Sequence, residues 1–456
     1  MGLDVGTTTV SLVLFDLDSN TVLTSRNKPH RADLSPDGSG AHLQDPEQIL
    51  DLCRHLVDEV SQERGEPRAI GVTGQMHGLL YLDGRGEVVS PVYTWLDNRV
   101  HWQSPGGGSY ADLLEKSLGG AVVPAGYGVA THFVHAQRGT VPKAARYAVT
   151  LLDYISMKLA RADSPVTDPT MAHSFGVYES HQGTMDQERW LKAEGGAIKL
   201  PRLAGEPRFL GTTSSGIPVT TPLGDNQASF IGSVAQPRES LLVNVGTSGQ
   251  VSLLLGQGAR PAPPAGIEGR PFPGGGLLWV GATLTGGKSL DILASLVSET
   301  DRLINGRVTS DHFQVLSDSL TNLKESAPLT VVTKFSGTRE DGSKRGSITN
   351  ISTENFSLGH LYRGFLAGVA DELAVLWERM RGVEPARIAK PAYLVAGGNA
   401  LRLSAPLRSA VSERFGMELY QTPYEEAAAL GAAVVAHSVS QEIPVTEASR
   451  RMVSYL

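Results

Sequence analysis

Cysteine is almost absent from the sequence, and so are several features that mark whole classes of protein. Cys53 is the single cysteine, which excludes an intramolecular disulfide and is typical of a reducing cytoplasm. The formal net charge is −7 and no basic run occurs, which argues against nucleic acid as a partner. No apolar run reaches the roughly 18–20 residues that a membrane span needs, and the first residues lack a signal-peptide pattern. We therefore expect a cytoplasmic protein that binds neither nucleic acid nor membrane.

Glycine, in contrast, is plentiful: the chain has 51, which indicates many tight turns and close backbone approaches. A chain of 456 residues has room for two domains with separate cores. Prolines accumulate at positions 201, 207, 218 and 222, just before a glycine-flanked acidic turn. We place the domain boundary there and expect domains at 1–222 and 223–456.

One short pattern occurs twice, once in each expected domain. The first copy reads LDVGTTTVSL over residues 3–12 and the second reads VNVGTSGQVSL over residues 243–253. Glycine followed by hydroxyl residues at the tip of a hairpin exposes backbone N–H groups and hydroxyls that can surround a phosphate. Either copy alone would also fit an ordinary turn. The repetition predicts a duplicated fold with two phosphate-binding turns.

Several helices and strands can be assigned from periodicity and capping. Asp45 and Pro46 begin a helix whose apolar stripe, from Ile49 to Val60, predicts core packing. Thr422–Glu425 has the arrangement of a capping box and predicts the start of the last helix. Small residues in that helix (Ala427, Ala428, Gly431 and Ala432) would let it approach a neighbour closely. Further helices are expected at 151–160, at 357–380 and from Ser404, and strands at 69–73, 277–282 and 392–396.

Two aspartates stand where phosphoryl transfer would need them. Asp4 ends a buried-looking strand beside the first turn and is placed to hold Mg²⁺, although a turn-capping aspartate is the alternative. Asp225 opens a helix of small residues and could accept a proton from a substrate hydroxyl, whereas seen alone it would more often be an N-cap.

A polar set between the two aspartates could hold a polyol, with amide, imidazole and carboxylate groups for hydroxyls and an indole as a wall. Its members are Gln75, His77, Trp95, Asp97 and Arg99. For His77 alone, a structural role is the simpler interpretation. Two glycine pairs, 286–287 and 397–398, resemble nucleotide approaches but also fit any turn between a strand and a helix.

Together these motifs resemble the FGGY family of carbohydrate kinases over essentially the whole chain, with the motifs at 4–8, 74–78, 95–99, 224–228, 244–249 and 397–399 in family order. The resemblance implies an α/β chain with the actin-like ATPase fold, two duplicated RNase H-like domains around a cleft. The first domain would bind the sugar, and the second the nucleotide. ATP and Mg²⁺ would be the cofactors, and a homodimer is a further expectation.

The resemblance also assigns roles to residues. Asp225 would be the catalytic base, and Asp4 and Asp225 would serve Mg²⁺. The phosphate-cradling residues would be Thr7, Thr8, Gly246 and Thr247, and those lining the nucleotide Gly287, Gly397, Gly398 and Asn399. The sugar-facing residues would be Gln75, Met76, His77, Trp95, Asp97 and Asp225.

Less diagnostic stretches at 127–131, 335–339, 345–349 and 356–360 resemble the sedoheptulose-phosphorylating members of the family. The expected reaction is therefore transfer of a phosphoryl group from ATP to a ketose. Sedoheptulose, giving the 7-phosphate, is the first choice, and xylulose or another pentulose is the alternative. An actin-like regulator that hydrolyses ATP without a sugar acceptor is the alternative from another class.

Two departures from the family pattern stand out. The family usually carries Lys or Arg four residues after Thr7, where this chain has Ser11. Lys288 could compensate, and otherwise phosphate neutralisation would be reduced. The first strand is also very short, so either it is weak or the numbering omits natural N-terminal residues.

Overall fold

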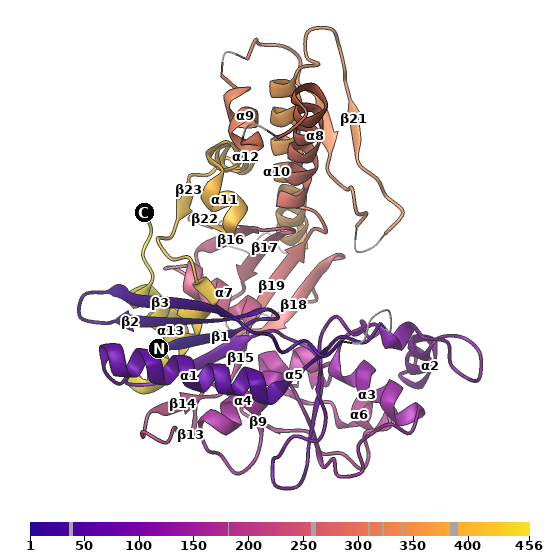
Figure 1. Ribbon diagram of the computed structural model, residues 1–456, viewed down its shortest axis with the longest axis vertical. Coiled ribbons are helices and arrows are strands. Elements are labelled where there is room, and N and C mark those ends of the chain that lie inside the picture. Colours follow the sequence, from indigo (N-terminus) through magenta and orange to yellow (C-terminus); the bar gives the residue numbers. More distant parts are fainter. Residues whose placement is uncertain are drawn as a thin grey trace. The chain divides into compact units, whose positions relative to one another are not determined.

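The computed structural model of the chain describes residues 1–35, 40–180, 182–256, 261–308, 311–321, 323–338, 341–383 and 391–456 (Figure 1). Arg339, in one of the stretches that suggested the sugar, lies outside these residues. The chain divides into two compact units. The first comprises Met1–Ala235, Pro271–Gly276 and Tyr424–Val453, and the second Gln236–Arg270, Leu277–Pro423 and Ser454–Leu456. The boundary predicted near Pro222 falls inside the first unit.

The first unit is built around a mixed sheet with the strand order β15-β5-β1-β2-β3. Its strands are β1 (Gly2–Val5), β2 (Thr9–Asp16), β3 (Thr21–Pro29), β4 (Leu43–Gln44), β5 (Gly71–Gly74), β6 (Leu80–Leu82), β7 (Val92–Tyr93), β8 (Tyr147–Val149), β9 (Val166–Thr167), β10 (Tyr178–Glu179), β11 (Thr184–Met185), β12 (Arg202–Leu203), β13 (Phe209–Thr212), β14 (Pro218–Thr220) and β15 (Leu223–Gly224). Its helices are α1 (Pro46–Arg64), the 3₁₀ turn η1 (Arg99–His101), α2 (Tyr110–Ser117), α3 (Gly128–Gln137), α4 (Leu151–Leu159), α5 (Pro169–Phe175), α6 (Gln187–Lys192), α7 (Asp225–Ser233), α13 (Ala427–Gln441) and α14 (Val445–Met452).

The second unit has a sheet with the order β18-β19-β17-β16-β22-β23. Its strands are β16 (Ser240–Val245), β17 (Gly249–Leu254), β18 (Ile267–Pro271), β19 (Leu277–Ala282), β20 (Thr330–Val332), β21 (Ser347–Thr349), β22 (Tyr393–Gly397) and β23 (Leu419–Gln421). Its helices are α8 (Gly287–Asn305), α9 (His312–Asp318), α10 (Leu358–Val383), α11 (Asn399–Leu403) and α12 (Ala405–Phe415).

The two sheets have the same central topology, which confirms the predicted duplication. In the first unit β1 pairs antiparallel with β2 and parallel with β5, and β5 is parallel with β15. In the second unit β16 pairs antiparallel with β17 and parallel with β22, and β22 is parallel with β23. The two sequence repeats therefore occupy equivalent hairpins, β1–β2 and β16–β17.

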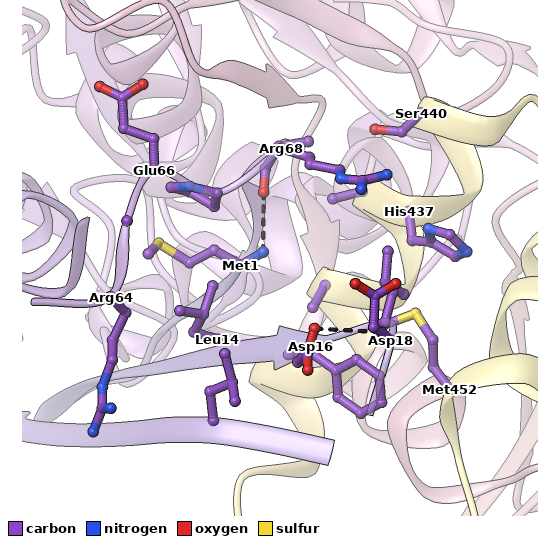
Figure 2. Close-up of a pocket in the computed structure, with 18 of the residues that line it drawn as sticks. Met1, Leu14, Asp16, Asp18, Arg64, Glu66, Arg68, His437, Ser440 and Met452 are labelled. Carbon is purple, nitrogen blue, oxygen red and sulfur yellow. Dashed lines mark hydrogen bonds between the residues drawn. The ribbon is translucent and has the colours of Figure 1, made fainter. Parts of the chain in front are cut away.

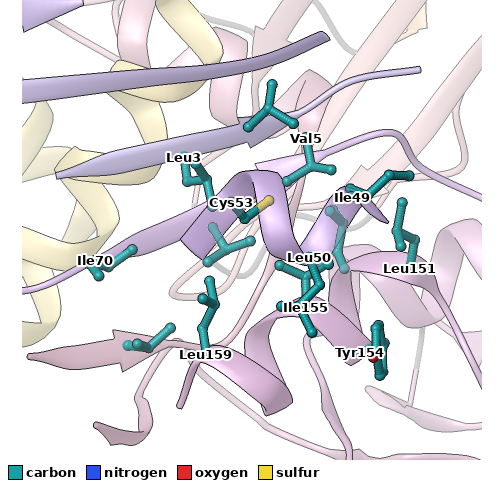
Figure 3. Close-up of a cluster of buried hydrophobic side chains, with 14 of the residues drawn as sticks. Leu3, Val5, Ile49, Leu50, Cys53, Ile70, Leu151, Tyr154, Ile155 and Leu159 are labelled. Carbon is teal, nitrogen blue, oxygen red and sulfur yellow. The ribbon is translucent and has the colours of Figure 1, made fainter. Parts of the chain in front are cut away.

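One face of the first sheet packs on the predicted amphipathic helix (Figure 3). Asp45 accepts the backbone N–H groups of Glu47 and Gln48 and so caps α1, as its sequence predicted. The stripe of α1 is buried against Leu3 and Val5 of β1, and α4 completes the same core. Cys53 lies in this cluster with no exposed surface.

The other face of the same sheet is covered by α13, which approaches through small residues. A Cβ on Gly2 or Gly71 would collide with backbone carbonyls of α13, and one on Gly431 would collide with the Ala228 carbonyl of α7. Only glycine allows backbones to approach this closely. The predicted close packing of this helix is confirmed, and it explains why Tyr424–Val453 belongs to the first unit.

The predicted start of α13 was wrong. The helix begins at Ala427 without a side-chain cap rather than at a capping box over Thr422–Glu425. The Tyr424 hydroxyl donates to the Met452 carbonyl at 3.1 Å, which holds this segment against α14, outside the helix. Nor is α13 the last helix, since α14 follows it.

Candidate active site

The first repeat forms a tight turn between β1 and β2. The Gly6 amide donates to the Thr9 carbonyl at 2.9 Å, and Thr8 is exposed at the tip. Thr7 is held from two directions, because the Trp95 indole donates to its hydroxyl at 3.0 Å and the Gln44 amide donates to its carbonyl at 2.7 Å. The turn is thus preorganised, with a hydroxyl at its tip facing solvent.

Two nearby carboxylates of the first unit act on Asp4 beside this turn. Burial first, and then the negative charges of Asp225 and Glu426, raise the pKa of Asp4 to about 7. Asp225 lies in the first turn of α7, where the Asn226 amide donates to its Oδ1 at 2.8 Å. The structure therefore brings Asp4 and Asp225, predicted as site residues, to one place. Glu426, just before α13, was missed because it was assigned to a helix start.

Position 11 lies directly opposite Asp4 in the β1–β2 register. Ser11 is only 3% exposed, and on its other side Asn27 pairs with it and donates to Glu426 Oε1 at 3.1 Å. A basic residue here would lie between two acids.

The segment after β5 carries two predicted sugar residues whose side chains are buried. Gln75 donates to Gln44 Oε1 at 2.8 Å, so it supports the residue that holds Thr7. Met76 is 4% exposed, and its sulfur accepts from the Asn226 amide at 3.7 Å. Both side chains therefore pack beneath the site, next to the turns that carry Thr7 and Asp225.

His77, the next residue, has a left-handed backbone with φ of 66°. Its Nδ1 lies 2.7 Å from the Ser174 carbonyl, which can only accept, so Nδ1 carries the proton. The ring stacks on Tyr127 at a centroid distance of 4.3 Å. The imidazole thus has a fixed orientation and a fixed tautomer.

Asp97 is 3% exposed, and both of its oxygens accept from Arg99 at 2.6–3.0 Å. The guanidinium also lies 5.1 Å from the Tyr93 ring centroid and 3.1 Å from His135 Nε2. Burial and then the Arg99 charge lower the pKa of His135 to about 3, so this imidazole is neutral. The Asp97–Arg99 pair is a rigid support for the loop that presents Trp95, whose indole is 45% exposed.

In the second unit, the second repeat turns between β16 and β17 and is held by the start of α8. The Gly286 amide donates to the Thr247 carbonyl at 2.9 Å and the Gly287 amide to the Gly246 carbonyl at 2.8 Å. Lys288 is exposed beside Thr247. Gly398 has φ of 81°, and a Cβ there would collide with Asn244 and with the Val245 carbonyl. The glycines predicted to line a nucleotide therefore surround one turn.

A cavity of about 680 Å³ opens beside this turn. It brings together Gly246, Thr247, Gly287 and Asn399 from the predicted set, and sequence reasoning missed the rest of its wall. The remaining lining residues are Leu290, Asp291, Asp311, Phe313, Gln314, Ser317, Tyr362, Ala400, Leu403, Ser404 and Pro406. Phe313 and Leu403 are 46% and 72% exposed, so the cavity offers apolar surface to a planar group. Gly397 and Gly398 are not among its lining residues.

Another pocket of the first unit contains none of the predicted site residues (Figure 2). It is lined by Met1, Leu14, Asp16, Arg64 and His437 among others, and lies at the opposite end of β2 from the Gly6–Thr9 turn. This pocket has a volume of about 200 Å³, and neither Asp4 nor Asp225 lines it.

Within the described ranges, no cluster of three or more His, Cys, Asp or Glu residues has the geometry to bind a metal ion. The same part of the chain contains no helix with the length and hydrophobicity of a membrane span.

Comparison with known proteins gives a consistent result. Residues 1–232 match the FGGY family of carbohydrate kinases, N-terminal domain. The chain is 26% identical to sedoheptulokinase of Mus musculus, over 91% of this chain and 92% of that one. It is 28% identical to xylulose kinase of Streptomyces coelicolor, over 65% and 62% of the two chains. The solved xylulose kinase of Rhodospirillum rubrum superimposes with a TM-score of 0.82 at 21% identity, covering 100% of this chain and 92% of that one.

The structural likeness confirms the predicted actin-like ATPase fold. The family match covers half of the chain, including the first turn and Asp225. The chain belongs to the FGGY family of carbohydrate kinases, and it is a sugar kinase.

Proposed function

We propose that the chain transfers the γ-phosphoryl group of ATP to the terminal hydroxyl of a ketose, with sedoheptulose as the preferred acceptor. The observation that carries this proposal is the placement, in one unit, of a carboxylate, Asp225, beside a segment that presents His77 and Trp95. A hydroxyl-rich acceptor needs such groups, and a nucleotide hydrolase does not.

Asp225 is the proposed general base. It lies at the first position of α7 and keeps a hydrogen bond from Asn226, which orients its carboxylate. As the sugar oxygen attacks the γ-phosphorus, its proton passes to Asp225, which becomes a carboxylic acid. The bond between the γ-phosphorus and the β–γ bridging oxygen breaks, and ADP is the leaving group. The imidazole of His77 carries a proton on Nδ1, which the Ser174 carbonyl accepts, and this side chain is proposed to face the sugar hydroxyls.

The nucleotide is assigned to the second unit. The cavity beside Gly246 and Thr247 has the size and the apolar wall for a nucleoside, and the turn lies where phosphates would follow. Exposed Lys288 lies at the start of α8, where its backbone amide donates to the Thr247 carbonyl at 3.2 Å, and it is the proposed cation for the phosphates. Gly397, Gly398 and Asn399 are proposed to complete the nucleotide's surroundings, and Thr7 and Thr8 are proposed as further phosphate-binding residues.

Mg²⁺ fits the carboxylates of the first unit. The negative charge of Asp225 makes the charged form of Asp4 less favourable, and a bound cation would offset this repulsion. When bound, Mg²⁺ would neutralise the phosphate oxygens during transfer. Asp4 and Asp225 are the residues proposed to hold it, through water.

We choose sedoheptulose as the first candidate sugar because of the similarity to known sedoheptulokinases. The sedoheptulokinases of mouse and human are similar over more than nine tenths of this chain. Xylulose kinases are similar over a shorter stretch, and a pentulose is therefore the second candidate. We further propose a cytoplasmic location, a homodimer and a division of the chain into a sugar-binding and a nucleotide-binding domain.

An ADP-release assay across acceptors tests the substrate. We expect release to rise sharply with sedoheptulose, less with xylulose and hardly with glycerol. Release that is independent of any sugar would favour an ATP hydrolase, and glycerol as the best acceptor would overturn the ketose assignment.

Asp225→Asn tests the mechanism. The change keeps the shape of the side chain and removes its basicity, so kcat should fall about 10²–10⁴-fold. ATP affinity, measured by calorimetry, should stay close to that of the wild type, while sugar affinity falls modestly. A variant that keeps most of its kcat would place the base elsewhere.

A further inference from the structure

Helix α5 of the first unit contacts both parts of the proposed sugar site, yet none of its residues is among the reacting groups. Thr170 and Ser174 are four residues apart, so they lie on one face of the helix. Each side chain has no exposed surface. In Figure 1, α5 lies beside β15, the strand that leads into Asp225.

Thr170 fixes the turn before Asp225. The Gly224 amide donates to the Thr170 hydroxyl at 2.9 Å. Asp168, whose carboxyl group is buried, caps α5 by accepting the Thr170 amide at 2.8 Å. The Thr170 hydroxyl therefore accepts from Gly224 while the backbone of the same residue is held by Asp168. The residue just before Asp225 is therefore tied to the end of a helix.

Ser174 fixes His77. Its hydroxyl accepts the His77 amide at 3.2 Å and donates to the Met171 carbonyl at 2.9 Å, and its own carbonyl accepts from the imidazole. The left-handed backbone of His77 is unfavourable for a residue with a side chain and needs such contacts to persist.

The far end of α5 supports the same imidazole from its other side. Phe175 packs so closely on Gly128, at the start of α3, that a Cβ there would collide with its ring. The residue before Gly128 is Tyr127, on which His77 stacks. The backbone and Nδ1 of His77 therefore contact α5 directly, and its ring face contacts Tyr127, which precedes the residue packed on α5.

We infer that α5 is a positioning helix for the sugar kinase site, in which Thr170 places the base Asp225 and Ser174 places the sugar-facing His77. This inference rests on the roles proposed above for Asp225 and His77. It assigns Thr170 to the chemical step and Ser174 to acceptor binding, and that division can be measured.

Thr170→Val keeps the shape of the side chain but leaves the Gly224 amide without its acceptor. We expect kcat to fall about tenfold, the effect of a buried donor left unpaired, while sugar and ATP Kd values change less than about twofold. Thr170→Ser retains the hydroxyl and should restore most of the rate. Thr220→Val is the matched control, because Thr220 is equally buried in the same unit and its hydroxyl has no partner.

A double variant tests whether Thr170 acts through Asp225. Thr170→Val should have almost no effect on the residual rate of Asp225→Asn, because the base that it places is already gone. Equal losses in both backgrounds would overturn the inference. If Thr170→Val does not fold, Thr170→Ala provides the same comparison.

Ser174→Ala removes one acceptor of His77 and leaves the carbonyl contact in place. We expect sugar Kd to rise about three- to tenfold with kcat within about twofold of the wild type. Variants that lower only Tm, with kcat and Kd unchanged per folded molecule, would make α5 merely structural. A wild type without sugar-dependent ADP release would overturn the proposed function and this inference together, whereas an active wild type whose variants show no such division overturns the inference alone.

Discussion

The two sheets of this kinase share one topology but differ in what they carry at equivalent positions. Asp4 of β1 corresponds to Asn244 of β16, since each lies one residue before the end of the strand that enters its turn. Opposite these two residues lie Ser11 and Gln250. The first turn spans residues 6–9 and the second only residues 246–248. The same hairpin thus presents a carboxylate in one unit and an amide in the other.

The glycines after the next strand show what the units have in common. Gly74 pairs with Val5, and Gly398 comes one residue after the pair Asn244–Gly397. Both have positive φ, and a Cβ on either would collide with the carbonyl of the residue before the turn glycine. The duplication therefore preserves the close backbone approach, while the acidic chemistry is confined to the first unit.

Exchanging the residues near the strand ends, Asp4 and Asn244, should have the largest effect on the kinetics. Asp4→Asn makes the first turn like the second, and kcat should fall about 10²-fold or more, because metal-based charge stabilisation contributes several kcal/mol. Asn244→Asp adds a charge where phosphates are proposed and should instead raise the KM for ATP about tenfold with a smaller change in kcat. Steady-state kinetics at several Mg²⁺ concentrations measure both, and equal effects of the two changes would contradict the division of roles.

Substitution of Gly74 and Gly398 tests whether the close backbone approach is equally important in the two units. Gly74→Ala and Gly398→Ala should each lower the free energy of unfolding by about 1–3 kcal/mol, from the positive φ alone. The collisions should add to this loss. Gly139→Ala and Gly306→Ala are matched controls, since these glycines have φ of 64° and 71° with open space around them. Calorimetric binding should then show weaker ATP binding for Gly398→Ala and weaker sugar binding for Gly74→Ala, and a reversed pattern would contradict the assignment of the units.

Ser11→Lys introduces the charge that the sequence comparison led us to expect at this position. A lysine there would lie between Asp4 and Glu426, so it should lower the pKa of Asp4 and tighten binding of Mg·ATP about tenfold, the effect of a charge-assisted hydrogen bond. Gln250→Lys is the control at the equivalent position. Unchanged or weaker binding in Ser11→Lys would mean that Lys288 or another group already supplies the charge.

A further prediction concerns the pH dependence of stability. Burial raises the pKa of Asp168 from its ordinary value of 3.8 to about 7. The folded state therefore binds more protons than the unfolded state across this range, and the contribution of Asp168 to stability is lost as pH rises from about 4 to about 7. Asp168→Asn keeps an N-cap and removes the titration, so its unfolding free energy should fall less between pH 4 and pH 8. Urea titrations of both proteins at these pH values measure the difference, and parallel curves would contradict it.

Local patterns predicted well whatever depends on neighbours in the chain. Asp45 with Pro46 marked the start of α1, and Ser404 marked that of α12, because a cap is satisfied by amides two or three residues away. The repeated turns were visible for the same reason. The capping box at Thr422–Glu425 failed because a distant contact, from Tyr424 to α14, outweighed it.

What the sequence by itself determined was the duplicated hairpin, the family and the residue types of the site. Only the tertiary structure decided which side chains contact one another and which hydrogen bonds they form. Gln75, Met76 and Asp97 stay predicted as sugar-facing residues, and the structure adds that their side chains are buried and contact Gln44, Asn226 and Arg99, respectively. Glu426, Phe313 and Thr170 carried no signal, because they reach the sites through folding that joins segments far apart in the chain. The pKa of Asp4 depends on its burial and on the charges of Asp225 and Glu426, and these act on Asp4 only when the chain is folded.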